Sequence, residues 1–234
     1  IINGYTPGPA TEKEWAETYP LEKEALDYFI NNAGSPNGVI DGGIPVFAAG
    51  NEYAGNPAFP GAYSKCVCVS SLAADFTPAC YTDFGSLVTL SAPGGDLEYY
   101  SKIGEQEDEY WAETTEQKGA VLSTMIKNGQ PAYGYMEGTS MACPHVSGVA
   151  ALGLAYAAKT NRHYRAADFV ALMKKSVKDL DSHYQNGATK TYYMNHTTVG
   201  ASPEIVQLSK YIGKMGAGPV SYTHLRAHET AANL

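Results

Sequence analysis

One stretch decides how this chain is interpreted: residues 138–148, which read GTSMACPHVSG. Gly138 allows the backbone to turn sharply where a side chain would obstruct it. The small and apolar residues that follow predict a helix over 140–159. Pro144 in the first turn of that helix costs little, because the amides there have no partner inside the helix. The pattern therefore predicts a tight turn that leads into a buried helix with Ser140 at its start.

This position gives Ser140 a special electrostatic surrounding. Free N–H groups and the positive end of the helix dipole converge at the start of a helix, where a developing oxyanion is stabilised. The turn and the helix therefore predict an oxyanion-stabilising position at Ser140.

Strand and helix patterns alternate along the chain. Apolar runs predict strands over 44–49, 65–72, 87–92 and 120–124, and helical patterns cover 12–30, 140–159 and 164–177. Thr11 and Glu14 form a capping-box pattern at the start of the first helix, and Pro20 should kink or split it. This alternation predicts the α/β class with a mostly parallel sheet flanked by helices.

Composition excludes several classes. The 234 residues carry a net charge of −8, so a basic nucleic-acid footprint is absent and no nucleic-acid partner is expected. The longest weakly polar run, 146–158, is too short to cross a bilayer, so no membrane span is expected. We expect an acidic, globular protein.

Four cysteines are too few for a disulfide scaffold, and no CxxC pair suggests zinc. We interpret Cys66, Cys68, Cys80 and Cys143 as small buried residues, with a bridge from Cys80 to Cys66 or Cys68 as an open alternative. The segment 96–118 holds eight acids and two lysines, which accounts for −6 of the net charge. A solvated loop is the simplest interpretation, and a calcium site or a lip that selects basic substrates are alternatives.

The stretch 138–148 resembles the nucleophile motif of the subtilisin-like serine proteases, the subtilases. Three further segments match the family pattern in the same order: VFAAGNE at 46–52, FPGAY at 59–63 and SAPG at 91–94. The resemblance covers residues 1–218 and implies a subtilisin-like three-layer fold, incomplete because its N-terminal part is missing.

The resemblance also implies roles for individual residues. Ser140 would be the nucleophile of a serine endopeptidase, and Asn51 would donate its side-chain amide to the oxyanion beside the Ser140 backbone N–H. The implied substrate-binding residues are Ala48, Ala49 and Gly50 as an open backbone edge, Gly4 and Tyr5 on the facing edge, and Thr139. Here the Gly4–Thr6 stretch departs from the family pattern.

The other two members of the family's catalytic triad are missing from the sequence. Neither the Asp-Thr/Ser-Gly pattern nor the His-Gly-Thr-His pattern occurs, and the first 43 residues contain no histidine. His145 lies five residues after Ser140 and should point away from it. We therefore expect an inactive portion of a peptidase domain, truncated at its N-terminus. A non-catalytic peptide-binding pseudoprotease is the alternative, whereas the absence of a Gly-x-Ser-x-Gly elbow disfavours an α/β-hydrolase.

The end of the chain departs from the family pattern after Gly218. Residues 219–234 resemble a reading-frame translation of a transposase-type sequencing adapter, so we expect 1–218 to be the native peptidase portion and 219–234 a foreign tail. We therefore expect no functional role for the histidines at 224 and 228.

The resemblance also implies a peptide or protein substrate, a secreted or cell-envelope location, and a monomer. No catalytic cofactor or metal is required, and a structural calcium ion is implied without identified ligands.

Overall fold

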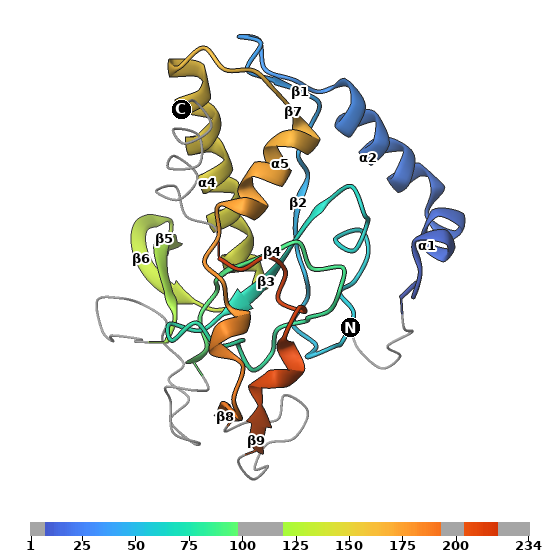
Figure 1. The fold of residues 1–234 in the computed structure, drawn as a ribbon. Coiled ribbons are helices and arrows are strands. Elements are labelled where there is room, and N and C mark those ends of the chain that lie inside the picture. The colour runs from blue at the N-terminus through green and yellow to red at the C-terminus, as the bar shows by residue number, and fades with distance from the viewer. Residues whose placement is uncertain (1–7, 98–118, 193–203, 220–234) are drawn as a thin grey trace.

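A parallel sheet of three strands lies at the centre of the structure, a computed structural model that describes residues 8–97, 119–192 and 204–219 (Figure 1). The strands are β2 (Val46–Ala48), β3 (Val67–Leu72) and β4 (Leu90–Pro93), in the order β2-β3-β4. Both neighbouring pairs run parallel. All six residues of β3 are buried, as expected for a middle strand covered on both faces. The predicted α/β class is confirmed.

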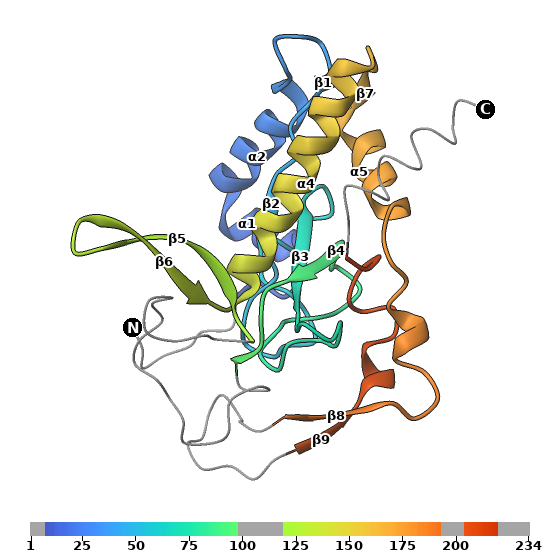
Figure 2. The same ribbon diagram turned by 90° about the vertical axis from the view of Figure 1, so that its left-hand side faces the viewer.

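Helices cover both faces of this sheet, which gives three layers (Figures 1 and 2). On one face, α4 (Thr139–Lys159) and α5 (Ala166–Lys175) share a hydrophobic cluster with Val46. On the other face, α1 (Glu12–Thr18) and α2 (Pro20–Asn32) share a cluster with Phe47. Because successive residues of a strand point to opposite faces, Val46 and Phe47 place the two pairs of helices on opposite sides.

The N-terminal helices form as their sequence predicts. The Thr11 hydroxyl accepts a hydrogen bond from the Glu14 N–H at 3.2 Å, and the Glu14 carboxylate accepts one from the Thr11 N–H at 3.2 Å. This is the expected capping box. Pro20 is the first residue of α2, where its missing N–H costs nothing, and so it divides the helical pattern into two helices.

Three further strand pairs lie outside the parallel sheet. The strands are β1 (Ile40–Asp41) and β7 (Tyr164–Arg165), which run parallel, and the antiparallel pairs β5 (Val121–Lys127) with β6 (Gln130–Met136) and β8 (Thr189–Tyr192) with β9 (Glu204–Gln207). Two 3₁₀ helices, Asp181–His183 and Leu208–Tyr211, complete the described elements. Buried tyrosines pack this C-terminal region into a third hydrophobic cluster.

The strand expected over 120–124 forms, but it belongs to a hairpin instead of the parallel sheet. Its turn is Asn128-Gly129, and both residues have positive φ, 51° and 76°. Such a pair makes the two-residue turn whose twist matches antiparallel strands. The Asn-Gly signal in the sequence therefore predicts this hairpin, and the apolar pattern alone missed it.

Helix α4 is the core helix of the structure. Its buried residues recur every three or four positions, at 142, 146, 150, 153 and 157, and they pack against β2, β3 and β4. Among the described helices, α4 alone is long and apolar enough to cross a membrane, by length and composition only. Its packing against the sheet accounts for this composition.

All four cysteines are free, so the open alternative of a bridge to Cys80 is wrong. Burial raises the pKa of the Cys66 and Cys68 thiols to about 12, which keeps them protonated and unreactive. The expected residues Gly4 and Tyr5, most of the acidic segment 96–118 and nearly all of the tail 219–234 lie outside the described residues. Pro219 is described, and it forms an isolated parallel bridge with Ser91.

Removing a side chain from the core should cost far more than removing one from the open face of α4. Phe169 is fully buried against Tyr164, whereas Leu152 is 53% exposed. We expect Phe169→Ala to lower the free energy of unfolding by about 3–5 kcal/mol, because it leaves a cavity. Leu152→Ala should change it by about 0.5 kcal/mol or less. Urea unfolding followed by circular dichroism measures both, and equal losses would contradict this packing.

Candidate active site

Ser140 is the second residue of α4 and its side chain is exposed. The turn before it depends on Gly138, which caps the helix with a φ of 142° that side-chain-bearing residues rarely adopt. Pro144 is the sixth residue of α4, one turn later than the sequence suggested. Its missing N–H leaves the Ser140 carbonyl without the usual donor four residues on. Ser140 therefore lies at an open helix start.

The Ala-Pro-Gly turn supports this loop from behind. The Gly138 N–H donates to the Gly94 carbonyl at 2.9 Å. A Cβ atom on Gly94 would lie 2.5 Å from the Gly138 carbonyl oxygen and 2.1 Å from the Ser71 hydroxyl oxygen. Only glycine allows two backbone segments to approach this closely. The match of 91–94 to the family pattern therefore has a structural reason.

Asn51 follows β2 and reaches the start of α4. Its side-chain oxygen accepts two hydrogen bonds from Thr139, from the backbone N–H at 2.9 Å and from the hydroxyl at 2.8 Å. Both bonds go to Oδ1, so the Nδ2 amide is left as a donor that points to the other side. The structure thus brings Asn51 and the Ser140 loop together, 88 residues apart in sequence.

Two donors converge beside Gly138. The point that a Gly138 Cβ would occupy lies 3.6 Å from Asn51 Nδ2 and 3.6 Å from the Ser140 backbone nitrogen. Among the described residues, the Ser140 N–H has no hydrogen-bond partner. The positive end of the 21-residue helix α4 adds to the field at this point. The arrangement can stabilise a developing negative oxygen.

The predicted substrate-binding residues differ in whether their peptide groups are free to bind a substrate. Ala49 donates to the Val69 carbonyl at 2.9 Å and accepts from Ala58 at 3.2 Å, so its peptide groups are engaged and form no open edge. Gly50 is also engaged on both sides. Ala48 alternates with Ala49 along β2, so its peptide groups point away from β3 and suit an added strand. Thr139 is buried against Asn51, and its role in substrate binding stays a prediction.

An apolar groove of about 390 Å³ lies beside the start of α4. It is lined by the first strand of the β5–β6 hairpin, by Met136, and by Met141, Pro144 and His145 of α4. Because Met141 directly follows Ser140, the groove begins next to Ser140. Its lining suits an apolar side chain of an extended peptide.

The described histidines are directed elsewhere. His145 Nδ1 lies 2.8 Å from the Met141 carbonyl oxygen, which turns the ring along its own helix. His163 bonds to the Gly38 carbonyl and, at 2.9 Å, to the Asp41 carboxylate, next to the β1–β7 pair. The Gly38 carbonyl first and Asp41 next raise the pKa of His163. Neither ring is placed as a base for Ser140.

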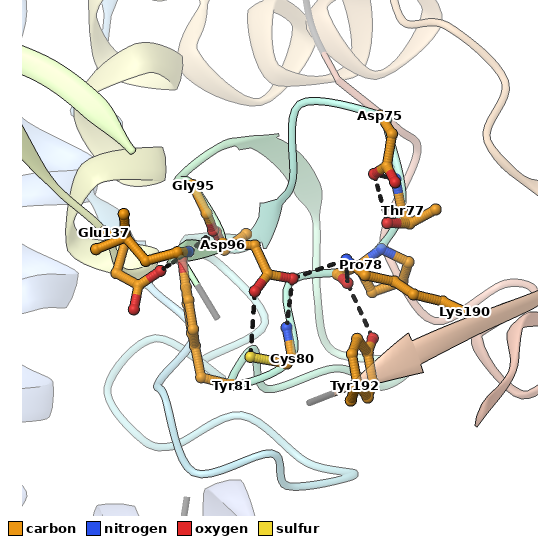
Figure 3. Close-up of polar contacts among 12 residues, drawn as sticks. Asp75, Thr77, Pro78, Cys80, Tyr81, Gly95, Asp96, Glu137, Lys190 and Tyr192 are labelled. Atoms are coloured by element: carbon orange, nitrogen blue, oxygen red, sulfur yellow. Dashed lines mark hydrogen bonds and ion pairs between the residues drawn. The ribbon is translucent and has the colours of Figure 1, made fainter. Parts of the chain in front are cut away.

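A buried ion pair behind the Ala-Pro-Gly turn was missed by the sequence analysis (Figure 3). Lys190 Nζ lies 2.7 Å from an Asp96 carboxylate oxygen, and the two side chains are 1% and 0% exposed. The Asp96 carboxylate also accepts from the Cys80 N–H at 3.1 Å and the Cys80 thiol at 3.3 Å. Lys190 additionally donates to the Pro78 carbonyl at 3.2 Å. This pair ties β8 to the segment that follows the turn.

Tyr81 holds the turn itself. Its hydroxyl donates to the Gly95 carbonyl at 2.6 Å (Figure 3). It also donates toward the Gly94 carbonyl at 3.1 Å and lies 2.8 Å from the Ser71 hydroxyl. Burial raises the pKa of this phenol far above its usual value, so it stays protonated and able to donate. No local motif marks Tyr81, Asp96 or Lys190, because their partners lie far away in sequence.

The described residues hold no group of three or more His, Cys, Asp or Glu side chains that could bind a metal ion. The described ranges therefore contain no carboxylate cluster for the structural calcium ion that the resemblance implies.

A serine at an open helix start beside two convergent donors is an arrangement that acyl-transferring serine hydrolases use. The model of the subtilase family, peptidase family S8, matches residues 7–195, and the chain belongs to this family of serine proteases. The fold and the family predicted from the sequence are both confirmed.

Several known proteins are similar to this chain. Halolysin of Haloferax mediterranei is 38% identical over 112 residues, which is 48% of this chain and 17% of halolysin. The halolysin-like extracellular serine protease Nep of Natrialba magadii is 32% identical over 113 residues, 48% of this chain and 16% of Nep. The structure of a lanthipeptide protease superposes with a TM-score of 0.57 at 19% identity, covering 93% of this chain and 57% of that protein. The chain thus spans well under two thirds of the length of these relatives.

The Asp96–Lys190 pair gives a stability prediction. Lys190→Met removes the ammonium partner of a buried carboxylate and should lower the free energy of unfolding by about 3–5 kcal/mol. The matched control is Arg165→Met, which breaks an exposed ion pair with Asp168 and should leave the urea midpoint nearly unchanged. Similar midpoints for the two variants would contradict the importance of the buried pair.

Proposed function

We propose that this chain carries the acylating machinery of a subtilase endopeptidase, with Ser140 as nucleophile and with Asn51 Nδ2 and the Ser140 N–H as oxyanion donors. The observation that carries this proposal is the convergence of the two donors, each 3.6 Å from one point beside Gly138. A peptide or protein is the substrate, and the extracellular relatives favour a location outside the cytoplasm.

The proposed reaction follows from the geometry. A peptide lies along the Ala48 edge and places its carbonyl carbon at the Ser140 hydroxyl. As Ser140 Oγ bonds to that carbon, its proton passes to a general base, and the carbonyl oxygen becomes an oxyanion that accepts hydrogen bonds from Asn51 and the Ser140 N–H. The tetrahedral species collapses when the protonated base gives that proton to the leaving amine, which breaks the C–N bond and leaves an ester on Ser140. Water, deprotonated by the same base, then hydrolyses the ester and returns the proton to Ser140.

The general base of this reaction is not among the described residues. His145 is bonded to its own helix, His163 lies beside β1, and His183 lies in a 3₁₀ helix in the C-terminal region. We therefore propose that the nucleophile-bearing portion of a peptidase domain, residues 1–218, does not cleave peptides by itself. Separately, the resemblance of 219–234 to a translated sequencing adapter supports the proposal that these residues are a foreign tail.

The first test concerns the two site residues within the product of the complete reading frame. A fluorophosphonate probe should label Ser140, and Ser140→Ala should abolish both labelling and peptide hydrolysis. Asn51→Ala should lower kcat by about 10²–10³-fold with KM little changed, because the lost bond forms fully only in the transition state. A labelled serine elsewhere would refute the assignment, and unlabelled Ser140 would favour a peptide-binding pseudoprotease.

The second test concerns the chain as it stands. The purified 234-residue protein should release no peptides from casein, because a serine hydroxyl without a base is a weak nucleophile. Mass spectrometry of the digest detects cleavage at low levels, and the Ser140→Ala variant controls for contaminating proteases. Cleavage that disappears in the Ser140→Ala variant would show that a base is present after all.

A further inference from the structure

Asp83 forms hydrogen bonds with the 50–54 loop, which carries Asn51. Its carboxylate oxygen Oδ1 accepts hydrogen bonds from the Glu52 N–H at 3.0 Å and the Ala54 N–H at 2.7 Å. Its own N–H donates to the Gly50 carbonyl at 3.0 Å. Asp83 is only 2% exposed. One buried residue thus bonds to the loop on both sides of Asn51.

The backbone at Gly50 lies directly on this carboxyl group. Gly50 has a φ of 120°, and a Cβ atom there would lie 2.2 Å from Asp83 Oδ2. No side-chain-bearing residue fits that approach. The contact therefore constrains the residue immediately before Asn51, while Glu52 and Ala54 constrain the residues after it.

A second carboxyl group shares this place. Glu52 Oε2 accepts from the Asn51 N–H at 2.8 Å and lies 2.7 Å from the same Cβ point on Gly50. The two carboxyl groups therefore face each other beneath Asn51. Among the described residues no Lys or Arg pairs with Asp83, and the neighbouring titratable groups are Glu52 and the Cys68 thiol.

We propose that Asp83 is a positioning residue that holds the 50–54 loop so that Asn51 keeps its oxygen on Thr139 and its Nδ2 beside Ser140. The proposal rests on the proposed function in one respect, since it takes Asn51 as the oxyanion donor. Three backbone bonds of the loop do not involve the carboxyl group. They are Asp83 N–H to the Gly50 carbonyl at 3.0 Å, and Tyr53 N–H to the Tyr81 carbonyl and Phe84 N–H to the Ala54 carbonyl, both at 2.9 Å. Loss of the carboxyl group should therefore loosen the loop without unfolding it.

The protonation of the pair predicts how the loop responds to pH. Burial first, and then the Glu52 carboxylate, raise the pKa of Asp83 to about 7. The neutral form is thus favoured in the folded chain, and its proton can be donated to Glu52. The stabilisation is complete below the pKa of 3.8 that an exposed aspartate has and is lost as pH rises through about 7. Above that pH two facing carboxylates repel.

Amide hydrogen exchange in the 234-residue chain tests the proposal without any catalytic assay. Asp83→Ala should accelerate exchange at Glu52 and Ala54 by about 10-fold or more, because both N–H groups lose their acceptor. Asp83→Asn should keep their protection, since its amide oxygen accepts the same bonds and its NH₂ donates to Glu52. The Ala49 amide, bonded to Val69, is the internal control and should stay protected in both variants.

The pH dependence of amide protection gives a second measurement. It should not differ between the parent chain and Asp83→Asn if Asp83 had only a structural role. The protection factors of Glu52 and Ala54 should fall above pH 7 in the parent chain and stay level in Asp83→Asn. Unchanged protection in Asp83→Ala, or identical pH profiles in the parent and Asp83→Asn, would overturn the proposal. If Asp83→Ala also exposes Ala49, the pH comparison with Asp83→Asn alone decides. A failed fluorophosphonate experiment would instead refute Ser140 chemistry and leave this exchange result standing.

Discussion

The site depends on two hydrogen bonds that one amide oxygen accepts. Asn51 Oδ1 binds the N–H and the hydroxyl of Thr139, and so it joins the end of β2 to the start of α4. These bonds orient the amide so that its NH₂ group faces the space beside Ser140. In a parallel sheet the carboxyl ends of the strands and the starts of the following helices meet at one edge, which is why this contact is within reach.

The rest of the structure keeps these two segments from moving apart. Gly94 lets the Ala-Pro-Gly turn lie directly against Gly138, and Tyr81 fixes the carbonyls of that turn. Behind it, the buried Asp96–Lys190 pair ties the turn to the C-terminal strands (Figure 3). On the other side Asp83 and Glu52 support the Asn51 loop. The contacts of Tyr81 and of the Asp96–Lys190 pair are buried, and buried polar contacts are costly to break once water is excluded. The bonds to Asp83 are partly buried, and the Glu52 bond to Asn51 is exposed.

Part of this arrangement could be predicted from local sequence because local chemistry decides it. The Thr11 capping box, the break at Pro20 and the helix after Gly138 all depend on residues within a few positions of one another. The β5–β6 hairpin was missed because the apolar pattern was weighed above the Asn128-Gly129 turn. The contacts of Tyr81, Asp83 and Lys190 could not be predicted, because their partners are brought together only by the packed strands.

By itself the sequence determined the α/β class, the subtilase family, and the place of Ser140 and Asn51 on a helix start and a strand end, because these depend on short motifs and hydrophobic periodicity. The tertiary structure alone decided that the peptide groups of Ala49 and Gly50 are engaged while those of Ala48 point away from β3. It also decided that two carboxyl groups meet beneath Asn51. The physical reason is that hydrogen-bond partners and burial are set by segments distant in the chain, which only the folded sheet brings into contact.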